Sequence, residues 1–134
     1  QYFETYRAYI ESFEMEDFRS MVDAGAVIVS GSQAHHPMAM EFYGGSFIHY
    51  GLGNLFFDQM YNDTYPILQG TRKEFIDRHV FYDGRHISTE LLTAFLEDYA
   101  RPRPMSADER LSFLQEIFAA GGWTPDDPWS YDLE

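Results

Sequence analysis

The chain has 134 residues, of which 45% are hydrophobic and 18% aromatic, so it is a folded domain or part of one and not a disordered segment. Its 22 Asp and Glu residues outnumber its 9 Lys and Arg residues, and a formal charge of -13 argues against partners such as nucleic acid or an anionic membrane surface. The absence of cysteine excludes disulfides, thiolate nucleophiles and cysteine-based metal sites. No apolar run approaches the ~18 residues of a membrane span, so we expect none in this chain.

The first predicted elements are a helix and a strand. A helix is expected over residues 13–24, with Ser12 as its cap and Gly25 just beyond its end. Residues 26–29 are uniformly apolar, which predicts a short strand buried on both faces. The polar loop 30–37 then follows the carboxyl end of this strand, where open α/β sheets bind ligands. One apolar stripe is expected on the helix, formed by Met15, Phe18, Met21 and Val22.

Two β-hairpins are predicted further along the chain. Each consists of two strand-like runs around a two-residue turn, Gly44-Gly45 in the first and Asp83-Gly84 in the second. The strands are expected over residues 38–43 and 46–50, and over residues 74–82 and 85–95.

The last part of the chain predicts a capped helix. The Arg-Pro-Arg-Pro run at 101–104 is expected to break the chain, and Ser106 to Glu109 form a capping box that starts a helix. This helix should end near Gly121-Gly122, and the acidic tail should dock Trp123 and Trp129. The expected apolar face of the helix comprises Leu111, Leu114, Ile117 and Phe118.

Five histidines are the first candidates for chemistry, because imidazole is the commonest protein ligand for transition metals. His35 and His36 lie in the loop after the buried strand. Adjacent residues of an extended backbone point to opposite sides, so only one of the two is expected to face a given site. Without further information, a loop histidine is more often a hydrogen-bonded surface residue than a ligand.

The remaining histidines favour structural roles. A two-residue turn pairs His79 with Ser88 and Phe81 with His86, which makes the two histidines diagonal neighbours about 7–8 Å apart. This spacing is loose for a shared metal ion, so two half-exposed strand histidines are expected. His49 is expected to be a satisfied residue at the edge of the core. The sequence has no Ser/His/Asp order, phosphate-binding glycine loop or nucleophile elbow.

Two segments, DAGAVIVSGSQAH (23–35) and MEFYGGSFIHYGLGNLFFD (40–58), together resemble the poly-γ-glutamate capsule-synthesis (CapA-type) family. That family typically reads "AGAD-x-V-x-GSHPH", then "IE-x-Y-x-G", then "FYSLGNFVFD". Its fold is similar to that of the calcineurin-like metallophosphoesterases, an α/β/β/α sandwich with a metal centre on loops at strand ends. The resemblance therefore implies an α/β fold: the C-terminal part of such a sandwich, with β-hairpins and a C-terminal helix.

The resemblance also implies site residues. Gln33 stands where the family has the first histidine of its loop, and His35 stands where it has the second. His35, Gln33 and His36 are the implied ligands of a divalent metal ion (Mn, Fe, Zn or Mg), and His35 and Asn54 the implied catalytic residues, with Asp58 helping to shape the pocket. A glutamine carbonyl is a weaker ligand for zinc or iron than imidazole, so the implied centre has lost one strong ligand here. Taken alone, Asn54 and Asp58 read as a turn residue and a helix-capping residue.

The family's other metal ligands lie upstream of the histidine loop, and neither "GDxxD" nor "NHE" occurs in this sequence. We therefore expect residues 1–100 to be the C-terminal half of such a domain, with the N-terminal half as its partner on another segment or chain. Residues 101–134 are expected to form a Pro-rich linker, the capped helix and the acidic tail.

Three functions follow from the resemblance as hypotheses. The first is a metal-dependent phosphoesterase-type hydrolase linked to capsular poly-γ-glutamate synthesis, with an anionic polymer or phosphoester as substrate and no activity in this piece alone. The second is a non-catalytic envelope protein that binds the polymer or has a structural role. The third is an acidic fragment that is only structural in isolation. The family implies an extracytoplasmic or cell-envelope location, with a cytoplasmic one left open, and the acidity implies bridging cations or a basic partner half for any anionic substrate.

Overall fold

The computed structural model describes residues 6–56, 70–98 and 101–123 of the chain. Within these residues, two helices, two small sheets and a short 3-10 helix form an α/β structure, which confirms the fold class predicted from the sequence. The full calcineurin-like sandwich remains a prediction. The elements are α1 (Ser12–Asp23), β1 (Ile28–Ser30), β2 (Met40–Tyr43), β3 (Ser46–His49), η1 (Gly70–Arg72), β4 (Lys73–Tyr82), β5 (Arg85–Glu97), β6 (Arg101–Pro104) and α3 (Ala107–Ala120).

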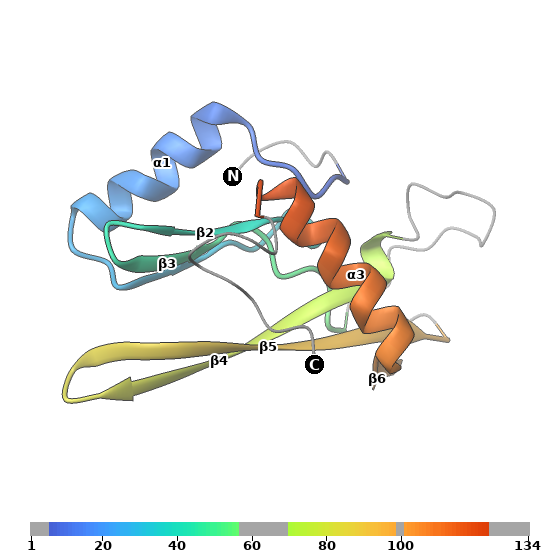
Figure 1. Ribbon diagram of the computed structural model, residues 1–134. Coiled ribbons are helices and arrows are strands. Elements are labelled where there is room, and N and C mark those ends of the chain that lie inside the picture. The colour runs from blue at the N-terminus through green and yellow to red at the C-terminus, as the bar shows by residue number, and fades with distance from the viewer. Residues whose placement is uncertain (1–5, 57–69, 99–100, 124–134) are drawn as a thin grey trace.

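The strands form two three-stranded sheets that face each other. In the first sheet the order is β1-β3-β2, with β1 parallel and β2 antiparallel to β3. In the second sheet the order is β4-β5-β6, all antiparallel. Figure 1 shows α1 on the first sheet, on the side away from the long β4–β5 hairpin, while α3 lies toward the opposite end of the molecule. The layers are therefore α1, the first sheet and the second sheet.

Helix α1 is close to the predicted range, but its cap differs from the prediction. Glu11, not Ser12, is the N-cap, and the carboxylate of Glu14 accepts a hydrogen bond from the Glu11 backbone N–H at 3.0 Å. Of the predicted apolar stripe, Met21 is exposed. The other members, Met15, Phe18 and Val22, are partly buried and pack against Val29, Met38, Ile48 and Tyr50 of the first sheet and its flanking loops.

Strand β1 is shorter and more exposed than the apolar run 26–29 predicts. Only Val29 is buried, and Val27 is 43% exposed. The prediction of a strand buried on both faces is therefore wrong. The physical reason is position, because β1 lies at the edge of its sheet and pairs, among the described strands, with β3 alone.

Both predicted hairpins are confirmed. Gly44 and Gly45 have φ values of 58° and 84°, which a two-residue turn of the primed type requires and which glycine adopts without strain. The second hairpin contains a bulge between Val80 and Phe81, so His79 pairs with Thr89 and not with Ser88 as predicted, while Phe81 pairs with His86 as expected. The rings of His79 and His86 are consequently only 5.7 Å apart between centroids.

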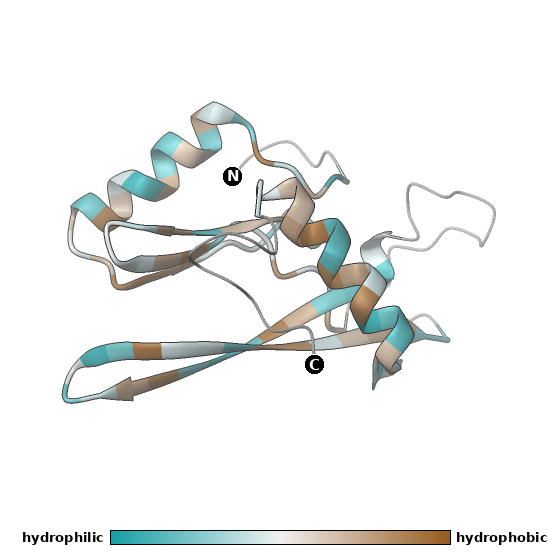
Figure 2. Cartoon of the chain, viewed as in Figure 1, coloured by the Kyte–Doolittle hydropathy of each residue, from teal (hydrophilic) through white to brown (hydrophobic). Residues whose placement is uncertain are grey.

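The larger core lies between the two sheets and α3. Ser106 caps α3 through the predicted box with Glu109, and the helix ends at Gly121 as expected. Leu111 is exposed, contrary to prediction, because the buried face is shifted to include Phe113. The side chains that fill this core are Met40, Phe47, Phe75, Phe113, Leu114, Ile117 and Phe118. Figure 2 shows hydrophobic and hydrophilic stretches following one another along β4 and β5, and apolar side chains such as Ile76 and Leu92 are exposed.

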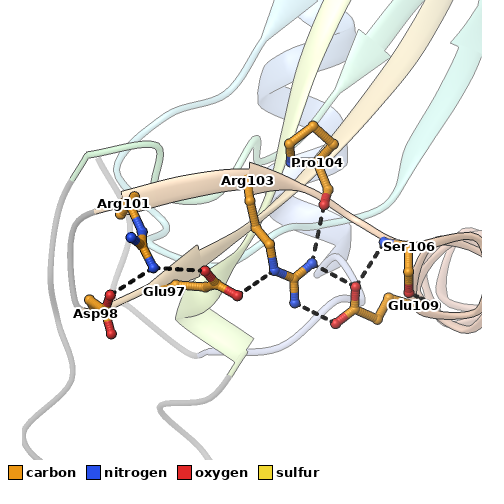
Figure 3. Close-up of polar contacts among 7 residues, drawn as sticks. All are labelled: Glu97, Asp98, Arg101, Arg103, Pro104, Ser106 and Glu109. Atoms are coloured by element: carbon orange, nitrogen blue, oxygen red, sulfur yellow. Dashed lines mark hydrogen bonds and ion pairs between the residues drawn. The ribbon is translucent and has the colours of Figure 1, made fainter.

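Trp123 docks after α3 as predicted, with its ring stacked 5.2 Å from Phe118 and 6.1 Å from Phe42 between centroids. Trp129 lies outside the described residues. The run 101–104, where the sequence predicts a break, is instead the edge strand β6, a position that tolerates proline. Figure 3 shows why it is held firmly: Arg103 on β6 bonds both to Glu97 on β5 and, through two nitrogens, to Glu109 on α3.

Candidate functional site

The candidate site consists of two loops at the carboxyl ends of β1 and β3. These strands are parallel, so residues 31–37 and residues 50–54 leave the sheet at the same edge. Two backbone hydrogen bonds tie the loops together: Gly31 N–H donates to the His49 carbonyl at 2.7 Å, and Met38 N–H donates to the Gly51 carbonyl at 2.9 Å. This is the edge at which ligands bind in α/β sheets, as the sequence predicts for the first of these loops.

His35 and Asn54 meet at this edge. Nδ1 of His35 lies 2.8 Å from Oδ1 of Asn54, and Asn54 is buried. Because an amide oxygen only accepts hydrogen bonds, Nδ1 carries the proton in this contact. In the neutral ring, Nε2 is then the nitrogen with the lone pair, which is the atom suited to bind a metal ion or to accept a proton. The two residues implied to be catalytic are thus brought together, 19 positions apart in sequence.

Asn54 is itself held by the backbone. Its Nδ2 donates to the carbonyl oxygens of His35 and Thr71, at 3.4 Å each. Asn54 therefore connects the histidine loop to η1, and its amide is fixed in the orientation that presents Oδ1 to the imidazole. A residue that orients an imidazole in this way acts on the reactivity of the histidine without touching a substrate.

His36 is packed into the protein. Its Nδ1 lies 2.7 Å from the carbonyl oxygen of Pro37, to which it donates, and burial lowers the pKa of the ring. Gly70 lies directly against it, since a Cβ at that position would be 2.2 Å from Nε2 of His36. These are the contacts of a neutral core histidine.

Gln33 lies in a different environment. It is exposed and lines a pocket of about 420 Å³ between α1 and the loop after β1. Glu14 and Asp17 of α1 also line this pocket, whereas His35 and His36 are not among its lining residues. The structure therefore does not bring the three implied metal ligands to one point.

The described residues do not fit a metal centre on their own. Across residues 6–56, 70–98 and 101–123, no three His, Asp or Glu side chains are grouped so that they could hold an ion. His35 is the implied ligand whose ring is oriented by a second side chain. Asp58, which the resemblance adds to the pocket, lies outside the described residues.

Sequence reasoning missed a buried polar group between the two sheets. His49 is fully buried, and its Nδ1 lies 2.7 Å from Oδ2 of Asp77 on β4, also buried. His49 was expected to be satisfied, but its Nε2 is buried without a hydrogen-bond partner. Glu74 is 1% exposed with neither carboxylate oxygen bonded, and burial raises its pKa to about 7. The available signal was strand alternation, which places Asp77 on the same face of β4 as the core residue Phe75.

The fold and the loops define a class, an α/β protein with a polar site at the carboxyl ends of parallel strands. The family model described as bacterial capsule synthesis protein PGA_cap matches residues 2–59, which include both loops of the site. This match supports the resemblance to the CapA-type family over residues 2–59 and, with it, an association with capsule synthesis. No curated protein matches the chain. Neither described helix is long and apolar enough to cross a membrane.

Proposed function

We propose that this chain is part of an envelope protein of poly-γ-glutamate capsule synthesis, in which His35 and Asn54 form part of a phosphoesterase-type active site. The observation that carries the proposal is the 2.8 Å contact between His35 Nδ1 and Asn54 Oδ1, within the segment that matches the capsule-synthesis family. An anionic polymer or a phosphoester is the substrate class, and the N-terminal half of the domain is the partner that would complete the site.

The chemistry assigned to His35 follows from its orientation. In phosphoester hydrolysis, a water oxygen attacks phosphorus, the bond from phosphorus to the leaving oxygen breaks, and the water must lose a proton. An imidazole whose Nδ1–H is held by Asn54 can accept that proton at Nε2. The resemblance also implies that this nitrogen binds a divalent metal ion (Mn, Fe, Zn or Mg), but Gln33 and His36, the other implied ligands, do not lie with His35 in the structure. Since the described residues supply too few ligands for a closed site, no step is assigned to a metal.

The test is hydrolysis of a p-nitrophenyl phosphoester by the full-length protein, together with its metal content by mass spectrometry. His35→Ala is expected to lower activity by roughly 10²–10⁴-fold, the usual contribution of a proton-transfer group. Asn54→Ala is expected to lower it less, by about 10–100-fold, because it removes only the orienting partner. Arg85→Ala, at the exposed end of the β4–β5 hairpin, is the control. Unchanged activity in His35→Ala would remove His35 from the site.

A non-catalytic, polymer-binding role is the second candidate. It is favoured by Gln33, which replaces a strong ligand, and by the separation of Gln33 from His35 in the structure. A chain of formal charge -13 repels a polyanion, so this role predicts that poly-γ-glutamate binds the full-length protein only when divalent cations bridge the charges. Calorimetric titration with and without Mg²⁺ tests it, and equal binding in the two buffers would contradict bridging.

A further inference from the structure

A group of three side chains on the β4–β5 hairpin has no part in the proposed site. Nδ1 of His79 on β4 and Nε2 of His86 on β5 each lie 2.8 Å from the same atom, Oγ1 of Thr89. The bulge after Val80 brings this geometry about, because it moves Thr89 opposite His79. The two rings are 5.7 Å apart between centroids and nearly perpendicular, at 72°. We refer to His79, Thr89 and His86 as the histidine clasp.

The clasp is where the outer half of the hairpin rests on the first sheet. Phe47 of β3 is buried, and its ring centroid lies 6.1 Å from that of His79 and 6.3 Å from that of His86. Toward the tip of the hairpin, the side chains are packed less closely against the rest of the described structure. The apolar residues toward its tip are already exposed, by 46% for Val80, 52% for Phe81, 77% for Tyr82 and 58% for Ile87.

The shared hydroxyl limits how many of the two imidazoles can be cationic at the same time. A threonine hydroxyl has one proton to donate and two lone pairs. While at least one ring is neutral, Oγ1 can donate to one imidazole and accept from the other. When both rings are protonated, both nitrogens are donors, the hydroxyl has to accept from both, and two positive charges face each other.

The neighbouring charges do not offset this repulsion. Within the described part of the chain, Asp77, on the same strand as His79, is the carboxylate whose charge acts on His79, and Asp77 is already bonded to His49 of β3. Apart from His79 itself, the rings that contact His86 from β3 and β4 are the uncharged Phe47 and Phe81. Burial lowers the pKa of His79, positive charge on His86 or His49 lowers it further, and Asp77 opposes the shift.

We propose that the histidine clasp is a proton-responsive contact: it holds the outer half of the β4–β5 hairpin on β3 while at least one of the two imidazoles is neutral, and it releases the hairpin when both imidazoles are cationic. The consequence is a hairpin whose apolar tip becomes free to move in mildly acidic surroundings. The inference is independent of the phosphoesterase proposal, since it uses none of the residues of that site.

Two measurements on the full chain test the proposal. Titration of the histidine ring protons by NMR should show two coupled protonation steps for the pair, separated by about one pH unit or more, which is about tenfold in the proton affinity. Amide hydrogen exchange, corrected for the intrinsic effect of pH, should accelerate about tenfold for residues 79–89 relative to residues 91–96 between pH 7 and pH 5.

Two variants test whether the imidazole of His86 is responsible for the acceleration. His86→Gln keeps a hydrogen-bonding partner for Thr89 but cannot become charged, so it should abolish the acceleration at pH 5. Arg85→Gln, which removes a charge next to His86 but no imidazole, should behave as the wild type. Independent titration of the two rings in the wild type would overturn the proposal. Coupled titration with unchanged amide exchange would overturn the claim that the hairpin is released. Both measurements are made on the wild-type chain, so neither depends on whether a variant folds.

Discussion

Helices α1 and α3 have similar sequence patterns but differ in how deeply they are buried. Both start with a capping box and both carry an apolar stripe. On α3 four apolar residues are buried (Phe113, Leu114, Ile117 and Phe118), whereas the one buried residue of α1 is the acidic Glu14. The difference arises because α3 packs into the core between two sheets, while α1 covers one face of a single small sheet. Amphipathic spacing therefore predicts which face of a helix is buried, but not how deeply.

The candidate site and the larger core also differ in how deeply their residues are buried. α1 and the loop after β1 line the pocket that contains Gln33, and both belong to the less buried side of the molecule. Regions with few buried apolar contacts open most readily, and sites that must admit a ligand are usually built there. The α3 side should accordingly provide most of the stability, and the α1 side most of the adaptability.

The sharpest test is to remove the same side chain from each helix. Phe113→Ala should lower the free energy of unfolding by about 3–5 kcal/mol, because Phe113 is buried and stacks on Phe75. Phe18→Ala should lower it by about half as much, because Phe18 is only partly buried, although it contacts Tyr50. Urea denaturation measures both values. Equal losses would show that the two helices are buried to the same effective depth.

Substitution of Gly31 tests whether the loop after β1, on the α1 side of the molecule, can move at little cost. A Cβ at Gly31 would lie 1.9 Å from the carbonyl oxygen of Tyr50, so Gly31→Ala forces the loop after β1 away from β3. We expect a loss of about 1–3 kcal/mol in the free energy of unfolding. Gly121→Ala is the milder control, because the nearest atom there, the carbonyl oxygen of Met40, is 3.2 Å away and has to shift by only a few tenths of an ångström. A loss no larger than in the control would mean that this loop moves at little cost.

Glu74 on β4 offers a test in which a substitution is expected to raise the free energy of unfolding instead of lowering it. Its folded pKa of about 7 lies above the ordinary 4.5, so the unfolded chain ionises first as the pH rises. The buried carboxyl therefore lowers the free energy of unfolding: this loss is absent below about pH 4.5, grows as the pH rises, and is complete above about pH 7. Glu74→Gln should raise the free energy of unfolding at pH 8 by on the order of 1–2 kcal/mol.

The gain from Glu74→Gln should shrink as the pH falls toward 4.5, where the wild-type carboxyl is protonated in both states. Glu90→Gln, whose carboxylate pairs with Arg78 at the surface, is the matched control and should change stability by less than about 1 kcal/mol at every pH. A pH-independent gain from Glu74→Gln would assign the effect to packing and not to charge.

The smallest expected effect concerns the helix caps. Ser106→Ala removes the acceptor for the Glu109 N–H and should lower the free energy of unfolding by about 0.5–1 kcal/mol. Ser12→Ala, at the position that the sequence predicts as the cap of α1, should have almost no effect because Glu11 is the cap. Thermal unfolding followed by circular dichroism distinguishes the two, and a comparable loss from Ser12→Ala would reinstate the predicted cap.

The parts of the fold that could be predicted are those with local causes. The turns at Gly44-Gly45 and Asp83-Gly84 and the cap at Ser106 depend on residues within a few positions, and the structure confirms all three. The exposure of Val27 and the strand at 101–104 depend on which elements lie beside them, which no local pattern records. The bulge that moves His79 opposite Thr89 likewise follows from the packing of the hairpin and not from its turn.

The candidate site divides in the same way. Its position at the carboxyl end of β1 and the identity of His35 and Asn54 could be predicted from the motifs and their order. The separation of Gln33 from His35 could not, because both have positive φ, 80° and 53°, and the backbone turns sharply between them. The bond between His49 and Asp77 joins residues 28 positions apart in two different sheets, and only the packing of those sheets brings it about.

The two prolines of β6 make one edge of the second sheet unsuited to pairing with a further strand. The Met105 N–H donates to the Thr93 carbonyl on β5, so the alternate nitrogens at Pro102 and Pro104 point outward, where proline carries no proton. An incoming strand would therefore meet an edge without donors on this side. The other edge strands of the two sheets, β1, β2 and β4, contain no proline and keep ordinary peptide groups along their edges.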